Sequence, residues 1–195
     1  RDYTPGIELQ TKLRGALVEV SIVNAHAGHH VTSADPERHL MVRVRAQRGG
    51  APRRTVAVRR LGQTWDWGAL EPLRPARKTG DTRIPHGKRA RWTVKLPSEW
   101  RAVEVDVAHV RVTPSNARHM KKANIPRELA RIWPQAPSAV ARLESVYPLM
   151  TWVARRRLVR GEAEWKETAL PDLLEASKAL RNATLEDHEA LFATE

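Results

Sequence analysis

We predict a mainly β fold, an antiparallel β-sandwich (Ig-like) with a short helical insertion before the last strand and a C-terminal helical tail. Apolar and polar residues alternate with a period of two through most of the first 160 residues, which is the pattern of half-buried strands. Gly and Pro clusters separate these segments, and helical spacing starts only after Pro114. Short strands punctuated by turns favour a sandwich over a βαβ fold.

The predicted strands each place one row of apolar side chains toward the core. In the second of them, Arg43 and Arg45 alternate with the valines, so one face is apolar and the other basic. Turn residues separate the strands at 48–52, 71–75 and 84–87. The apolar rows lie in residues 16–22, 40–46, 90–96 and 103–107, and a closing strand spans 147–159.

Helical spacing occupies two parts of the chain. Residues 116–122, 126–132 and 137–143 form the insertion, at about 114–144, with Pro126 and Pro137 placed to open helical turns. Beyond Gly161, a helix is predicted from Pro171 and a second turn from Thr184. We therefore divide the chain into a basic sandwich domain, 1–161, and an acidic, helical tail, 162–195.

The charge of the chain is large and unevenly distributed. Among 195 residues, 34 are Lys or Arg and 22 are Asp or Glu, a net charge of +12. Residues 162–195 contain nine acidic and three basic residues, net −6, so residues 1–161 carry net +18. Such a field attracts acidic partners and the acidic tail itself. Because the sequence has no nucleic-acid-binding motif, we expect an acidic protein surface as partner, and we interpret most basic clusters as the solvated face of a sheet.

Absent residue types exclude several functional classes. The chain has no cysteine, so it has no disulfide, no thiolate metal site and no attachment point for a covalent c-type haem. It contains no nucleophile elbow, phosphate-binding Gly-rich loop or zinc-protease helix, which predicts a non-catalytic protein. No apolar run has the length of a membrane span. The start at Arg1 lacks an initiator Met, and we expect a processing site or a fragment boundary there.

The candidate functional residues concentrate between two predicted strands. His26, His29 and His30 share one loop, and His39 and Met41 lie on one side of the strand that follows. Neutral imidazole binds haem iron, copper or zinc, and a thioether can assist copper. These five residues therefore form a hypothetical copper site. The alternative is that the histidines are ordinary solvated loop residues and that Met41 packs at the sheet edge.

The same loop resembles a known family. The run from Asn24 to Arg38 resembles the loop Asn-x-Gly-Ala-Gly-His-x-x-Pro-Thr-Gly-x-Pro-x-Arg in the β-rich C-terminal domain of bacterial multihaem c-type cytochromes of the cytochrome c-554-like family. Residues 81–87, 110–112 and 147–150 resemble further family segments in the family's order. The chain has Thr32-Ser33-Ala34 in place of Pro-Thr-Gly, and it lacks the haem-attaching Cys-x-x-Cys-His motifs.

The resemblance implies a haem-free module or subunit of a multihaem electron-transfer assembly, periplasmic or extracellular in a bacterium. It implies that His29, and less directly His30, reaches a haem iron held by a haem-bearing partner chain or segment. Arg38 would then bind a haem propionate through its planar guanidinium, or else form an ion pair with Asp35 or Glu37. A copper-binding His/Met module and a purely structural protein-interaction domain remain as alternatives.

Two expectations concern structure alone. Asp81 and Arg83 should pair within a turn. Four tryptophans at strand or helix positions should belong to the core: Trp92, Trp100, Trp133 and Trp152.

Overall fold

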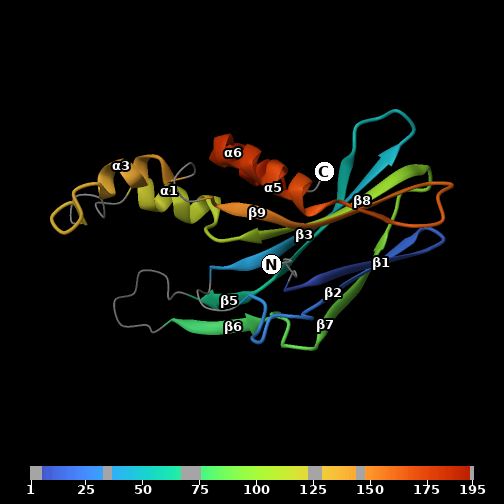
Figure 1. Ribbon diagram of the computed structural model, residues 1–195, viewed down its shortest axis with the longest axis horizontal. Helices are drawn as coiled ribbons and strands as arrows, with labels where there is room; N and C mark the ends of the chain where they lie inside the picture. Colours follow the sequence, from blue (N-terminus) through green and yellow to red (C-terminus); the bar gives the residue numbers. More distant parts are fainter. Residues whose placement is uncertain (1–5, 33–36, 67–75, 123–128, 144–147, 194–195) are drawn as a thin grey trace.

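A computed structural model of the chain describes residues 6–32, 37–66, 76–122, 129–143 and 148–193. It confirms a mainly β, antiparallel, sandwich-like fold with helices toward the C-terminus (Figure 1). The strands are β1 (Glu8–Arg14), β2 (Leu17–Val23), β3 (His39–Arg48), β4 (Arg54–Leu61), β5 (Gln63–Asp66), β6 (Arg77–Asp81), β7 (Arg89–Lys95), β8 (Trp100–Val110), β9 (Met150–Val159) and β10 (Lys166–Glu167). The helices are α1 (Pro114–Lys122), α3 (Ala136–Ala141), α5 (Leu170–Ala179), the 3-10 helix η1 (Leu180–Asn182) and α6 (Leu185–Ala190).

Two sheets pack face to face around the main core. One has the order β1-β2-β7 and the other β10-β9-β8-β3-β4, with every pairing antiparallel; β5 and β6 form a separate two-stranded ribbon. Val18 and Val20 of β2 and Val105 of β8 are fully buried between the sheets. The period-two alternation in the sequence thus corresponds to strands in which every second residue faces this core.

Part of the other face of the five-stranded sheet is also buried, because the C-terminal helices cover it (Figure 1). Trp152 and Met150 of β9 pack there with Leu173 and Leu180. The Ser177 hydroxyl accepts a hydrogen bond from the Trp152 amide at 2.9 Å. The acidic tail therefore forms a layer on the sheet and is in contact with it.

An ion cluster lies on this second buried face. Asp106 of β8 is fully buried, and its carboxylate pairs with Arg43 (2.8 Å), Arg45 (3.2 Å) and Arg155. The neighbouring Glu104 pairs with Arg45, Arg155 and Arg53. Burial raises the pKa of the Asp106 carboxyl, but the charges of Arg43, Arg45 and Arg155 outweigh burial and leave this pKa below its usual value.

The cluster extends to the tail through Arg43. Its Nη1 donates to the Leu191 carbonyl at 2.8 Å, and its guanidinium carbon lies 5.0 Å from the centre of the Trp152 ring and 5.8 Å from that of Phe192. A separate set of ion pairs connects the tail with the helical insertion, since Arg118 of α1 pairs with Glu186 and Glu189 of α6. The sequence pattern predicts that the arginines of β3 lie on a solvated face. This is wrong for Arg43, since only 5% of its surface is exposed.

The helical elements agree with the predicted insertion and tail. Helices α1 and α3 project beyond one end of the sheets (Figure 1), and α6 starts with a capping box in which Thr184 and Asp187 exchange hydrogen bonds. The predicted helix at 126–132 lies partly outside the described residues. No helix in the described part of the chain is long and apolar enough to cross a membrane.

The local predictions for the Asp81–Arg83 pair and for the tryptophans have different outcomes. Arg83 and Asp81 pair as predicted, at 2.7 Å, and Trp100 and Trp152 are buried. Trp92 is only half-buried, with Arg59 stacked on its ring. The prediction for Trp133 is wrong, because it follows a turn at the edge of the insertion and is 50% exposed.

The buried His39 lies at the start of β3, and the half-buried His109 lies near the end of β8. His39 is 4% exposed, and its Nδ1 lies 2.6 Å from the Glu37 carbonyl oxygen. Burial, with further contributions from Arg60 and His109, lowers the pKa of His39 to about 4. Burial, with contributions from Arg111 and Arg38, lowers the pKa of His109 to about 4 as well. Both side chains are therefore neutral imidazoles at pH 7.

Replacing Asp106 with Asn should strongly destabilise the fold, because the buried Arg43 and the half-buried Arg45 and Arg155 lose the counter-charge that they share. We expect a loss of about 3–5 kcal/mol in the free energy of unfolding, measured by urea denaturation at neutral pH. Asp81→Asn, which breaks the more exposed pair with Arg83, is the matched control and should cost less than about 1 kcal/mol. Equal losses in the two variants would show that the buried cluster contributes no more than a surface pair.

Acidification should destabilise the fold through His39 and His109. The unfolded chain binds protons at these imidazoles near pH 6.5 and the folded chain only near pH 4, so the unfolded chain holds more protons in between. The free energy of unfolding therefore falls as the pH decreases from 6.5 to 4. In urea titrations at several pH values, His39→Gln and His109→Gln should each flatten this decline, whereas the exposed His30→Gln should not. If the decline is unchanged in both His39→Gln and His109→Gln, this origin is contradicted.

Candidate functional site

Two loops at one end of the three-stranded sheet form a joined structure, which we call the histidine edge and define as residues 24–32 and 84–88. The fully buried Asn24 joins them, because its Nδ2 donates to the carbonyls of His29 (2.7 Å) and Ile84 (2.9 Å). Val31 and Ile84 also form a β-bridge with two backbone hydrogen bonds. An amide with two donors can hold two loops at once, so the backbone on which these histidines sit is fixed.

His29 is exposed on this edge in a defined orientation. Its Nδ1 lies 3.0 Å from the carbonyl oxygen of His30. A carbonyl can only accept, so the neutral ring carries its proton on Nδ1 and keeps a lone pair on Nε2. This is the arrangement of metal-binding histidines, in which a hydrogen bond from one ring nitrogen fixes the tautomer and the other nitrogen binds the metal.

His86 has the same arrangement and was not among the predicted site residues. It is exposed, and its Nδ1 lies 2.8 Å from the carbonyl oxygen of Ala27 in the opposite loop. Gly87, at φ 69°, closes the turn and donates its amide to the Asn24 carbonyl. The sequence marks residues 84–87 as a turn, but the signal that brings His86 to the edge is the long-range pairing of Val31 with Ile84.

The remaining loop histidines differ from these two. His26 is exposed, and its Nε2 lies 3.6 Å from the Glu8 carboxylate, so that nitrogen faces an acidic group. His30 is also exposed and supplies the carbonyl that orients His29. The edge thus presents four exposed imidazoles, of which His29 and His86 have Nδ1 engaged by backbone.

The predicted copper site is not assembled. His39 is buried, with Nδ1 toward the Glu37 carbonyl, and Met41 is half-buried in the layer under the C-terminal helices. The reason is the strand itself: both side chains belong to the sheet face that the tail covers, whereas His26, His29 and His30 lie in the exposed loop. Within the described residues, no three His, Cys, Asp or Glu side chains are placed to hold one metal ion.

Arg38 lies between the loop and the helical insertion. Its carbonyl accepts a hydrogen bond from the Thr32 hydroxyl at 2.6 Å. Its half-buried side chain lines a groove of about 630 Å³ beneath α1 and α3. Asp35, one of its predicted ion-pair partners, lies outside the described residues.

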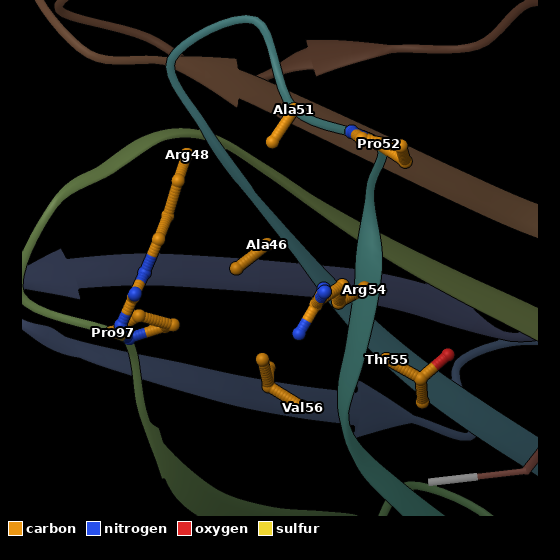
Figure 2. A pocket seen from close by; sticks show the side chains of 8 residues that line it. All are labelled: Ala46, Arg48, Ala51, Pro52, Arg54, Thr55, Val56 and Pro97. Atoms are coloured by element: carbon orange, nitrogen blue, oxygen red, sulfur yellow. The ribbon is translucent and has the colours of Figure 1, made fainter. Parts of the chain in front are cut away.

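A basic hollow of about 560 Å³ occupies the opposite end of the sandwich (Figure 2). Arg48 and Arg54, which flank the β3–β4 hairpin, extend along it, and Ala46, Val56 and Pro97 contribute apolar surface. No acidic residue is among the described residues that line the hollow. Two guanidiniums over an apolar floor make it suited to a carboxylate.

Comparisons with known proteins bear on the fold. No protein-family model matches the sequence, and no curated protein matches it. Among solved structures, the fold is similar to part of a penta-haem cytochrome c552 from Thermochromatium tepidum, with a TM-score of 0.51 and 15% identity. The match covers 79% of this chain and 39% of the cytochrome. A superoxide reductase in the oxidised state also matches, at 14% identity over 55% of this chain and 82% of the reductase, but its TM-score of 0.28 is too low to indicate a shared fold. The chain thus shares its fold with a region of a multihaem cytochrome.

Proposed function

We propose that this chain is a non-catalytic module of a multihaem electron-transfer assembly, in which His29 supplies a distal ligand to a haem iron held by another chain or segment. The observation that carries the proposal is the exposed His29 imidazole, whose Nδ1 is engaged by the His30 carbonyl, which leaves the lone pair of the neutral ring on Nε2. The fold shared with part of a penta-haem cytochrome supports this class of function. The sequence has no cysteine to attach a c-type haem covalently, and the proposal takes the haem from another chain or segment.

The rigidity of the histidine edge suits this role. A ligand to a haem on another chain must be held in position before the partner arrives, since any loop ordering on binding costs affinity. Asn24 and the Val31–Ile84 bridge provide that order in the isolated chain. A haem partner of this kind places the protein in the bacterial periplasm or outside the cell, which is part of the proposal.

The basic end of the sandwich would then dock an acidic surface of the partner. The hollow between Arg48 and Arg54 is the best-defined cationic feature of that end (Figure 2). Opposite charges raise the rate of encounter, and a guanidinium pair adds directional hydrogen bonds to a carboxylate.

The ligand role is tested by replacing His29 with Ala in the native assembly and recording its absorption spectrum and reduction potential. We expect one low-spin haem to become high-spin and its potential to shift, because the iron loses an axial imidazole. His86→Ala and His30→Gln are the matched controls and should leave the spectrum unchanged.

Two outcomes contradict the assignment to His29. A spectrum that changes only in His86→Ala would transfer the ligand role to that residue. Unchanged spectra in all three variants would remove the ligand role altogether and leave a structural interaction domain.

The docking role is tested with the double variant Arg48→Gln/Arg54→Gln. Its association rate with the haem-bearing chain purified from the native assembly should fall by about tenfold at low ionic strength. At high salt, the rates of the variant and of the unaltered chain should become more similar, because salt screens the charges. Arg131→Gln, which removes an exposed charge from the helical insertion, should have little effect. An equal fall in both variants would indicate a general charge effect and overturn the assignment to this hollow.

A further inference from the structure

Large apolar side chains are exposed on the turn that precedes α3, which we call the apolar turn and define as residues 129–134. Ile132 is 87% exposed, Trp133 50% and Leu129 37%. Within the described part of the chain, these are three of the six large apolar residues that are exposed. Single exposed apolar residues are common on protein surfaces, but a contiguous patch of them marks an interaction surface.

The backbone of the apolar turn is ordered. The amides of Ile132 and Trp133 both donate to the Leu129 carbonyl, at 3.0 and 2.6 Å, and the Ala136 amide donates to the Trp133 carbonyl at 3.0 Å. The insertion projects beyond one end of the sheets, and this turn lies at the outer end of the projection (Figure 1). The exposed side chains are therefore the first part of this end to meet a surface that approaches it.

The apolar turn belongs to a basic segment. Residues 114–143 contain six Lys or Arg and one Asp or Glu. One of the six, Arg118, is compensated by Glu186 and Glu189 of the tail. Lys122 and Arg131 are exposed, and none of the residues that the structure describes in 114–122 and 129–143 is acidic. The apolar turn therefore lies in a region of positive charge.

A second exposed apolar pair has the opposite surroundings. Leu170 and Leu174 of α5 are 38% and 55% exposed, but Asp172 and Glu175 lie on the same helix within the acidic tail. Apolar exposure combined with positive charge is thus a property of the insertion and not of α5. This combination suits a surface that is negatively charged outside and apolar underneath, which is the chemistry of a bilayer with anionic headgroups.

We propose that the helical insertion docks on an anionic lipid surface, with Ile132 and Trp133 in the headgroup layer and Lys122 and Arg131 near the lipid phosphates. Tryptophan favours this layer because its ring is apolar and its N–H is polar. Apolar insertion and basic attraction together give firmer binding than either gives alone. The inference goes beyond the proposed function and does not depend on it, since these residues lie outside the histidine edge and the basic hollow.

The test is cosedimentation of the full chain with vesicles made of equal parts phosphatidylglycerol and phosphatidylcholine. The chain should bind these vesicles, and it should bind much more weakly to vesicles of phosphatidylcholine alone, because the latter carry no net charge. Ile132→Ser should weaken binding by about tenfold, since a large apolar side chain no longer leaves water. Arg131→Gln should weaken it by about fivefold, the effect of one basic residue near an anionic surface.

Two variants outside the insertion are the matched controls. Leu174→Ser removes an exposed leucine from α5, and Arg101→Gln removes an exposed arginine from the end of β8 that is remote from the insertion. Both should bind vesicles like the unaltered chain. Weakening by Arg101→Gln as large as that by Arg131→Gln would show attraction to the whole basic molecule and overturn the assignment to the insertion.

A spectroscopic measurement reports on Trp133 directly. Bromine atoms on the acyl chains of the lipid should quench part of the tryptophan fluorescence when the chain binds. Trp133→Phe should keep most of the binding and lose most of that quenching, because the tryptophan in contact with the bilayer is gone. Quenching that persists in Trp133→Phe would place a different tryptophan at the lipid and contradict the proposed orientation.

Two further results would overturn the proposal. One is a lack of vesicle binding by a chain whose circular dichroism shows the native strand content, which would leave the apolar turn as a contact for a protein partner. The other is unchanged binding by Ile132→Ser, which would show that charge alone holds the chain to the vesicles. His29→Ala should bind vesicles like the unaltered chain, so this test and that of the His29 ligand role have separate outcomes.

Discussion

The buried carboxylate of Asp106 is the constraint on which the outer half of this structure depends. Strand β8 has two buried faces: its valines at 103–107 fill the space between the sheets, and its acidic residues lie on the other side. A carboxylate with no solvent exposure is tolerable only with counter-charges and hydrogen bonds around it. Arg43 and Arg45 of β3 and Arg155 of β9 provide them from the two flanking strands, so the cluster ties together the three central strands of the sheet.

The same cluster explains why the tail covers this face. Arg43 has donors beyond those that Asp106 uses, and the Leu191 carbonyl accepts one of them. Trp152 and Phe192 then enclose the guanidinium, and the Ser177 hydroxyl accepts from the Trp152 amide beside the register shift between β8 and β9. Each of these groups would otherwise meet water or remain unpaired. The tail is therefore the cover that the polar groups on the outer face of the sheet require.

Much of the fold could be predicted from the sequence, since period-two alternation along β2, β3 and β8 depends on local side-chain order. The chemistry of the second face could not. Arg43 and Arg45 have the pattern of a solvated face, and only the pairing of β3 with β8, some sixty residues apart in the chain, places Asp106 beside them. For the same reason the sequence identified the His29 loop but not His86, whose position depends on the Val31–Ile84 bridge. Local patterns predicted elements, and long-range pairing determined which side chains meet.

Neutralisation inside the molecule also determines where its charge can act on a partner. Glu104 and Asp106 compensate arginines at the centre of the outer face, and the tail pairs Glu186 and Glu189 with Arg118. The positive charge in the middle of the five-stranded sheet is therefore partly compensated, since four arginines share two carboxylates there. Arg48, at the far end of β3, lines the hollow of Figure 2, and no acidic residue is among the described residues that line this hollow. Since exposed charges are screened beyond about 10 Å, the charge of this surface acts on its surroundings through such local features more than through the net charge of +12.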